Sequence, residues 1–464
     1  MTVTTRSETR LSPQQWAARY RADDGEQQPI SVVERCFGLE TQRKRHGLEL
    51  MRPLLAALGN PQLAYPVVHI TGSKGKGSTA AMIAAILQAY GLRVGLYISP
   101  SLTHFEERIQ VNGAWIEPQA TARYVTRLRQ SLQSSALPPP KFFEAATAVA
   151  FLHFRDSEVD VAVVEVGIGG RRDATNVVHA EVAVLTTIEL EHTAILGSSL
   201  GAIAKEKAGI IKPGSWVVSG VELAEARQVV LAEARSQGAQ LLELEREFDA
   251  VQRCCEPTWQ RIDVRLEAGW FPCLSLQNVP LRLPGCYQAR NAALAVAASQ
   301  LLLRRIGRLE QRFTEAVHRG LGALSWPGRL ELCWLQQRPV LLDVAHTPGS
   351  MEQLVEYVTR FFANRRVVVV LGLLRDKPLE AIAAVLSEIA SEVCIAPVKW
   401  YRTAEPASVA AALESYGVPT TRWPSIRRAL QAALERTTER DLIVLTGSVF
   451  AVGEAKRAYG LEGH

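Results

Sequence analysis

The stretch HITGSKGKGSTAAMIAAILQAYG, from His69 to Gly91, places glycines and lysines between an apolar run and a helical pattern. The strict phosphate-loop pattern fails here, because Ile70 stands where the first glycine belongs and Gly77 separates Lys76 from Ser78. The loop nevertheless leaves a predicted strand and enters a predicted helix, so backbone N–H groups and the positive helix end would converge on one point. We interpret the stretch as a phosphate cradle in preference to a strand-to-helix turn with surface lysines.

Each residue of this predicted cradle has a chemical role. Gly75 and Gly77 would let the backbone approach an anion closely. Lys76 would neutralise the β and γ phosphates of a nucleotide, and Ser78 would turn its hydroxyl toward a magnesium ion. The stretch therefore predicts a nucleotide site at the end of an early strand.

The sequence around the cradle predicts an α/β fold. From Tyr65 onward, β-rich apolar runs alternate with helical patterns, which is typical of βαβ units and a parallel sheet. A polar, irregular stretch at 244–281 has room for a few short strands, and a second alternating set follows Trp326. We predict an ATP-binding domain at 1–308, a linker at 309–325 and a smaller α/β domain at 326–464.

Composition limits the function classes. A chain of 464 residues with 47% apolar residues can fill two cores. No apolar run is long enough to span a bilayer, the first 16 residues lack the apolar core of a secretory signal, and seven scattered cysteines argue against a disulfide framework or a structural zinc site. We expect a cytoplasmic protein. A net charge of +5 without a polybasic block suits a small anionic substrate better than nucleic acid.

Polar side chains follow several predicted strands of the first domain. Glu165 ends one strand, His192 follows the next, and Ser99 follows an earlier one. Because ligands bind at the carboxyl ends of parallel strands, this trio is a candidate set of ligands for a divalent cation. The alternative for Glu165 is an ion pair with Arg171 or Arg172.

A similar pattern occurs in the second domain. Asp343 and His346 follow a predicted strand and lead into a helix. If they face the first domain, they could complete a site at the domain interface. The alternative is a helix-capping cluster with Thr347 and Ser350.

Read in order, these motifs resemble the folylpolyglutamate synthase and dihydrofolate synthase family of the ATP-dependent Mur ligase superfamily. The resemblance rests on GSKGKGS, SPSL, EVGIGGRRDATN, LEHTAILG, EKAGIIKPG, PGCYQARNAA, WPGRLE and LDVAHTPGS, and it covers nearly the whole chain. It implies a P-loop, Mur-ligase-like ATPase domain with a parallel-rich sheet and a smaller, Rossmann-like C-terminal domain for glutamate ligation.

The resemblance also implies the site residues. They are the phosphate-loop residues Lys74, Gly75, Lys76, Gly77 and Ser78, the magnesium ligands Ser99, Glu165 and His192, the nucleotide contacts Asn291, Arg329 and Asp343, and the substrate-pocket residues Phe143, Glu144 and Asp173. Lys207 matches a lysine that such ligases carbamylate to hold a second magnesium ion. His346 matches a histidine near the incoming glutamate, so we expect Lys76, Lys207 and His346 to be catalytic.

The implied enzyme is a monomeric ligase that adds L-glutamate to a folate through an acyl phosphate, using ATP and two Mg²⁺ ions and no nucleic-acid or membrane partner. Departures from the family pattern, such as Lys74 for asparagine and Glu191 for aspartate, leave open whether dihydropteroate is also an acceptor. A non-folate acid substrate, a non-catalytic nucleotide-binding partner and a generic P-loop phosphotransferase are the alternatives.

Overall fold

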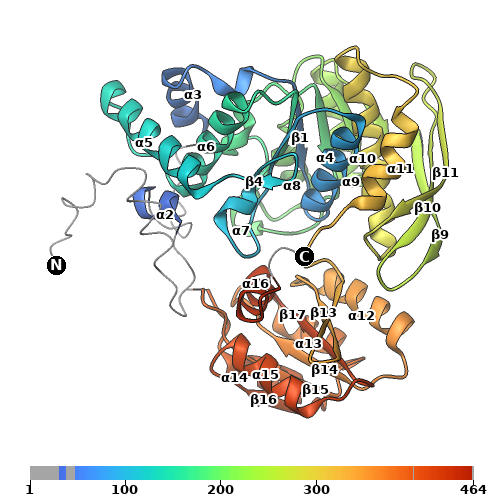
Figure 1. Cartoon of the computed structure of the whole chain (residues 1–464). Coiled ribbons are helices and arrows are strands. Elements are labelled where there is room, and N and C mark those ends of the chain that lie inside the picture. Colours follow the sequence, from blue (N-terminus) through green and yellow to red (C-terminus); the bar gives the residue numbers. More distant parts are fainter. Residues whose placement is uncertain (1–30, 38–46, 401, 462–464) are drawn as a thin grey trace.

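The computed structural model describes residues 31–37, 47–400 and 402–461. The first 16 residues, in which no secretory signal is predicted, lie outside the described part. Figure 1 shows two α/β bodies, with the C-terminal strands and helices grouped below the larger N-terminal body. Within the described residues, no helix is long and apolar enough to cross a membrane, and all seven cysteines are free.

The larger body is built on an eight-stranded sheet. Its strand order is β4(Ala114–Trp115), β3(Ile109–Val111), β2(Val94–Tyr97), β5(Val161–Glu165), β1(Val67–Thr71), β6(Val182–Leu185), β7(Trp216–Ser219), β8(Gln240–Glu243). The six strands β2, β5, β1, β6, β7 and β8 pair in parallel, and only β3 and β4 run antiparallel to their neighbours. The predicted parallel-rich sheet is therefore confirmed, with β1 between β5 and β6.

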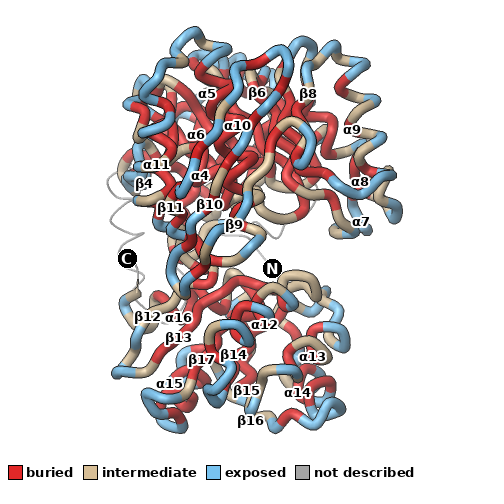
Figure 2. Tube along the Cα trace, turned by 90° about the vertical axis from the view of Figure 1, so that its right-hand side faces the viewer, coloured by how far each residue is buried: buried red, intermediate tan, exposed pale blue. Residues whose placement is uncertain are grey.

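Helices cover both faces of this sheet, which explains why β1 is apolar without alternation. One face carries α4(Lys76–Tyr90), α10(Cys286–Arg305) and α11(Phe313–Ala323). The other carries α2(Val32–Phe37), α3(Leu48–Ala57), α5(Pro118–Ser135), α6(Phe142–Asp156), α8(Leu200–Ala208) and α9(Ala224–Ser236). Helix α4 is apolar nearly all round, because the sheet covers one side and α10 and α11 cover the other. Figure 2 shows the resulting buried layers.

The stretch at 244–281, predicted to hold short strands, forms a separate antiparallel sheet. It consists of β9(Phe248–Cys255), β10(Gln260–Leu266) and β11(Leu274–Leu281). In β10, buried and more exposed residues alternate, as expected for a sheet with one face on a core. The buried face joins the core formed by α4 and α10.

The smaller body is a six-stranded sheet with helices on both faces. Its order is β12(Glu331–Leu335), β13(Arg338–Leu342), β17(Leu442–Thr446), β14(Val367–Leu371), β15(Glu392–Ile395), β16(Thr420–Arg422), and only β12 is antiparallel. One face packs on α12(Pro348–Phe362), α13(Leu379–Ser387) and α14(Pro406–Glu414), and the other on α15(Ile426–Arg436) and α16(Val449–Ala458). This matches the predicted second α/β unit.

Residues 309–325, predicted as a linker, contain helix α11. Phe313, Val317 and Leu321 are buried in the same core as α4, and α11 packs directly on α4. The connection to the smaller body therefore leaves from a helix packed on the first domain. The exact domain boundaries stay a prediction.

Candidate active site at the domain interface

The predicted phosphate cradle lies at the carboxyl end of β1, in the middle of the large sheet. Two of its glycines are required by close neighbours. At Gly72 (φ 153°) a Cβ would overlap the Thr186 hydroxyl, and at Gly75 (φ 80°) a Cβ would lie 2.5 Å from Asn291 Oδ1. Helix α4 begins directly after Gly75, so its free N–H groups point to the place expected for an anion.

Hydrogen bonds hold the cradle against the segment that follows β6. The Ser73 N–H donates to the Thr187 carbonyl at 2.7 Å, and the Lys74 N–H donates to the Thr187 hydroxyl at 3.0 Å. The Thr186 hydroxyl donates to the Lys74 carbonyl at 2.5 Å. The loop is therefore preformed by contacts with a segment about 110 residues away in sequence.

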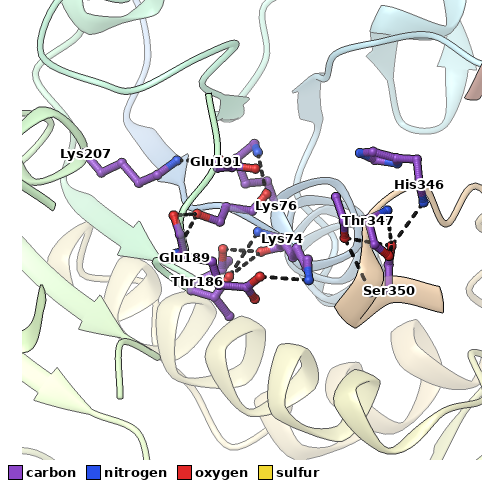
Figure 3. Close-up of polar contacts among 11 residues, drawn as sticks. Lys74, Lys76, Thr186, Glu189, Glu191, Lys207, His346, Thr347 and Ser350 are labelled. Carbon is purple, nitrogen blue, oxygen red and sulfur yellow. Dashed lines mark hydrogen bonds and ion pairs between the residues drawn. The ribbon is translucent and has the colours of Figure 1, made fainter. Parts of the chain in front are cut away.

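The two lysines of the loop have different partners. The Lys76 ammonium donates to the carbonyl oxygens of Gly72 and Ser73, at 3.0 and 3.3 Å, so it lies over its own loop. Lys74 forms a 2.8 Å ion pair with Glu189, and its Nζ lies 3.0 Å from where a Cβ on Gly349 of α12 would be. Lys76 thus lies over the cradle, while Lys74 reaches the smaller domain (Figure 3).

Lys207, on α8, points into the same place. Its Nζ donates to the Gly72 carbonyl at 2.7 Å and to Glu191 at 3.2 Å, and its side chain is 2% exposed. Burial, together with the charge of Lys76, lowers the pKa of Lys207 to about 8. A buried amine with this pKa is partly uncharged near neutral pH, which is the form that reacts with carbon dioxide.

Glu191 was considered in the sequence only as a departure from the family pattern, and the structure gives it a role. Burial alone would raise the pKa of its carboxyl, but the charges of Lys76 and Lys207 outweigh burial and lower it. The neighbouring Glu189 pairs with Lys74. The loop after β6 therefore supplies two carboxylates that pair with the ammonium groups of Lys74 and Lys207. Both carboxylates are visible in the sequence as IELEH.

The predicted metal ligands Ser99 and Glu165 meet at the ends of β2 and β5. Glu165 Oε2 accepts a hydrogen bond from the Ser99 N–H at 3.0 Å, and burial raises the pKa of this carboxyl. His192 has a left-handed backbone (φ 49°) and a pKa lowered by burial. Among the described residues, no group of three or more His, Cys, Asp and Glu side chains is arranged to hold a metal. The assignment of the three residues as ligands therefore stays a prediction.

The nucleotide candidate Asn291 lies on α10 and faces the cradle. Its Nδ2 donates to Gln288 Oε1 at 2.9 Å, which leaves Oδ1 facing Gly75. Gln288 is fully buried and was not singled out from the sequence, although it lies in the PGCYQARN motif. Gln288 thus fixes which end of the Asn291 amide faces the cradle.

On the second domain, Asp343 uses both carboxylate oxygens on backbone groups. Oδ1 accepts from the Ala345 N–H and Oδ2 from the Leu330 N–H, each at 2.8 Å. Burial raises the pKa of Asp343, and the nearby Arg329 partly offsets this. Asp343 therefore holds the backbone next to Arg329. A direct contact of Asp343 with ribose stays a prediction.

His346 is a neutral imidazole in this site. Its Nδ1 lies 2.9 Å from the Val344 carbonyl, which can only accept, so Nδ1 carries the proton and Nε2 has a free lone pair. Burial and the charge of Lys377 lower the pKa of His346 to about 4. Thr347 and Ser350 form the predicted capping box of α12, and the Ser350 hydroxyl also accepts from the His346 N–H at 3.0 Å. The capping cluster and His346 thus share one turn (Figure 3).

Two predicted substrate residues, Phe143 and Glu144, begin α6. The Phe143 ring lies so close to Gly167 that a Cβ there would be 2.6 Å from it. Glu144 is fully buried and accepts from the N–H groups of Gly47 at 3.0 Å and Lys141 at 2.8 Å. The structure therefore gives Glu144 a capping role, and its contact with substrate stays a prediction.

Asp173, the third predicted substrate residue, caps a short helical turn, η4(Ala174–Val177). Its Oδ1 accepts from the Thr175 hydroxyl at 2.7 Å, and its Oδ2 accepts from the Ile168 N–H at 3.1 Å. The Thr175 hydroxyl in turn lies 2.9 Å from Nε2 of the buried His69. This loop is held rigidly beneath β1, on the same side of the sheet as Phe143.

A cavity of about 510 Å³ lies elsewhere, between α4, α11 and the β3–β4 hairpin. It is lined by small side chains such as Ala81, Ala85 and Ala323, and by none of the predicted site residues. The cavity is therefore not part of the candidate active site.

Comparison with known proteins identifies the family of this chain. Residues 328–449 match the family model described as Mur ligase, glutamate ligase domain. The folylpolyglutamate synthase of Lacticaseibacillus casei is 35% identical over 410 residues, which cover 87% of this chain and 92% of that protein. The dihydrofolate synthase/folylpolyglutamate synthase of Bacillus subtilis is 33% identical, covering 89% of this chain and 94% of that protein.

Solved structures agree with these relatives. Mycobacterium tuberculosis folylpolyglutamate synthase complexed with ADP and AMPPCP superposes with a TM-score of 0.81 at 33% identity, covering 90% of this chain and 96% of that chain. Escherichia coli FolC in complex with DHPP and ADP superposes with a TM-score of 0.82 at 26% identity, covering 98% of this chain and all of that one. The match therefore includes both domains and the region between them.

Proposed function

Because the chain belongs to the folylpolyglutamate synthase and dihydrofolate synthase family of Mur ligases, we propose that it uses ATP to join L-glutamate to the carboxylate of a folate. The observation that carries this proposal is the convergence of Lys76 and Lys207 on the carbonyl of Gly72 in the phosphate cradle. A nucleotide-binding loop alone would not require a buried second lysine from α8.

The reaction must first activate the acceptor, because a carboxylate has no good leaving group. The γ-phosphoryl group of ATP passes to a carboxylate oxygen, which breaks the bond from phosphorus to the β,γ-bridging oxygen and releases ADP. Lys76 would leave the carbonyls of Gly72 and Ser73 and follow the charge of the transferred group, while the N–H groups at the start of α4 hold the β-phosphate.

The amide bond then forms at the second-domain side. The glutamate amine attacks the acyl carbon and expels inorganic phosphate, which takes up the proton that the amine loses. Neutral His346, with Nε2 free, can accept a hydrogen bond from the attacking amine. Because the residues that we assign to the reaction come from both domains, closure would exclude water from the acyl phosphate.

We infer a magnesium site near the cradle from the kinds of donor atoms that lie there. Ser99, Glu165 and His192 would hold one ion, since a buried carboxylate with a raised pKa is a group that a nearby cation stabilises in its charged form. Bound magnesium would supply Lewis-acid stabilisation of the phosphate oxygens. Lys207, once carbamylated, would offer anionic oxygens for a second ion. The contacts of its Nζ with Gly72 and Glu191, beside the cradle, support this proposal.

As the acceptor carboxylate we propose that of a reduced folate first, with dihydropteroate second. The relatives divide between a folylpolyglutamate synthase and bifunctional enzymes with dihydrofolate synthase activity, and E. coli FolC binds DHPP. The test is phosphate release from ATP with L-glutamate, comparing a reduced folate with dihydropteroate. Activity with reduced folate alone indicates a dedicated polyglutamate synthase, and activity with both indicates a bifunctional enzyme. Activity with neither would contradict the proposed substrates.

A further inference from the structure

The turn that carries Arg329 has an unusual backbone. Gly328 (φ 73°) and Leu330 (φ 47°), on either side of Arg329, both adopt left-handed conformations. Such a conformation is costly for leucine, so surrounding contacts must hold it. The direction of the Arg329 side chain therefore depends on what fixes this turn.

The Arg329 guanidinium itself donates to the Gly328 carbonyl at 3.1 Å. Three further hydrogen bonds, from other residues, hold the backbone on both sides of Arg329. The Gly328 carbonyl accepts from the Val344 N–H at 3.1 Å, and the Leu330 N–H donates to Asp343 at 2.8 Å. The Gly328 N–H donates to Glu331 Oε2 at 2.7 Å. Of these, only the Glu331 contact comes from a side chain that is itself held by another element.

That element is α16. Lys456, whose side chain is 2% exposed, forms a 2.6 Å ion pair with the second carboxylate oxygen of Glu331. Burying a lysine is costly unless its charge is paired, and the proposed reaction makes no use of this lysine. The pair therefore connects the Arg329 turn, through one carboxylate, to a helix more than 100 residues away in sequence.

Helix α16 is in turn fixed on the first domain. A Cβ on Gly453 would overlap the Leu102 carbonyl, so the helix lies directly on the segment after β2. Arg457, next to Lys456, donates to the Thr103 carbonyl at 2.9 Å. The same short helix thus contacts the segment that carries Ser99 and holds the turn that carries Arg329.

We propose that Glu331 and Lys456 are positioning residues that aim Arg329 at the nucleotide phosphates. This rests on the proposed function, in which Arg329 is a phosphate contact. Glu331 accepts a hydrogen bond from the Gly328 N–H, and the ion pair with Lys456 fixes the position of the Glu331 carboxylate. Loss of this hold would leave Arg329 present but free to swing away, which weakens ATP binding in particular.

Paired substitutions separate this role from stability. Lys456→Met alone leaves a partly buried carboxylate unpaired, so we expect unfolding at lower urea concentration. Lys456→Met with Glu331→Gln removes both charges but keeps an acceptor for the Gly328 N–H, and its KM for ATP should stay close to that of the parent. Lys456→Met with Glu331→Met removes the acceptor as well, and its KM for ATP should rise about tenfold, with the KM for glutamate unchanged.

A second variant guards against misfolding of the methionine pair. Glu331→Asp keeps a carboxylate that can still pair with the buried Lys456, but it is one methylene too short to reach the Gly328 N–H as well. It should therefore raise the KM for ATP while the urea midpoint stays near the parent value. We call Lys456→Met with Glu331→Gln the glutamine pair and Lys456→Met with Glu331→Met the methionine pair. Equal KM values for ATP in these two pairs and in Glu331→Asp would overturn the proposal.

The deciding measurement is the KM for ATP of the methionine pair, Lys456→Met with Glu331→Met, in an Arg329→Ala background. Residues that act through Arg329 should add less than about twofold to the loss already caused by Arg329→Ala, because the two effects are not independent. A full additional tenfold loss would show a general structural role and overturn the proposal. If Arg329→Ala itself leaves the KM for ATP unchanged, the phosphate role of Arg329 fails and the inference fails with it. If the methionine pair has the parent KM for ATP while Arg329→Ala has a raised one, the inference is overturned and the proposed function stands.

Discussion

Lys207 and Gly72, 135 residues apart in sequence, are joined by a 2.7 Å hydrogen bond from the lysine ammonium to the glycine carbonyl. This bond sets the buried amine of α8 against the phosphate cradle. The bond gives the unmodified lysine a structural role, and carbamylation would give it a chemical one. The first prediction concerns that change.

We predict that activity depends on dissolved carbon dioxide. Carbamylation needs the uncharged amine, and since the pKa of Lys207 is lowered to about 8, raising the pH from 7 to 8 should increase the uncharged fraction and speed reactivation. Enzyme depleted of bicarbonate should lose activity and regain it on addition. Lys207→Met should be inactive in both conditions, while Lys205→Met, at an exposed position on the same helix, should behave like the parent. Full activity without bicarbonate would contradict carbamylation.

The two loop lysines should differ sharply. Lys76→Ala should lower turnover by at least about 100-fold, because it removes the charge that follows the transferred phosphate. Lys74→Ala should cost less than about tenfold, since Lys74 forms a partly exposed ion pair with Glu189. Phosphate release at saturating ATP measures both. Similar losses in the two variants would contradict the assignment of Lys76 to the phosphate.

Crowding the Phe143 ring should impair acceptor binding selectively. In Gly167→Ala the new Cβ would lie 2.6 Å from that ring, and the acceptor KM should rise roughly tenfold with little change for ATP. Gly95→Ala is the matched control, because its Cβ would lie 2.8 Å from the ring of Phe154 in the core. Both should lose about 1–3 kcal/mol of unfolding free energy. An unchanged acceptor KM in Gly167→Ala would remove Phe143 from the substrate pocket.

The buried His69 should make stability depend on pH. Burial lowers its pKa to about 3 from an ordinary 6.5, so the unfolded chain binds the proton more readily than the folded one. The contribution of His69 to the free energy of unfolding is fully present above pH 6.5. It should fall as the pH drops toward 3, by up to about 1.4 kcal/mol per pH unit. His69→Gln keeps a donor for Thr175 and should flatten this slope in urea titrations, whereas His179→Gln, at an exposed position, should not. An unchanged slope in His69→Gln would contradict the explanation.

The sequence predicts the fold well because local patterns carry it. The apolar run of β1, the glycines after it and the helical pattern of α4 are adjacent, and their order alone places a phosphate site at a strand end. Helix α11 was missed inside the predicted linker, although Phe313, Val317 and Leu321 recur with helical spacing. That signal was available in the sequence.

The partners within the site could not be predicted in the same way. Glu144 and Asp343 look like free carboxylates in the sequence, yet each accepts from two backbone N–H groups, one of them from a distant segment. Likewise, nothing local indicates that Lys456 meets Glu331. Such pairings arise only when separate segments pack, so spacing along the chain contains no record of them.

The position of α16 has a consequence for the order in which the enzyme is made. Arg457 contacts the carbonyl of Thr103, 354 residues earlier, and Gly453 lies on the Leu102 carbonyl. On the ribosome, the large sheet can form long before this helix emerges, because all of its strands precede residue 244. A nascent chain would therefore hold a folded phosphate cradle but lack Lys456, whose ion pair with Glu331 fixes the Arg329 turn. Premature ATP consumption by unfinished chains would be limited by the late arrival of one short helix.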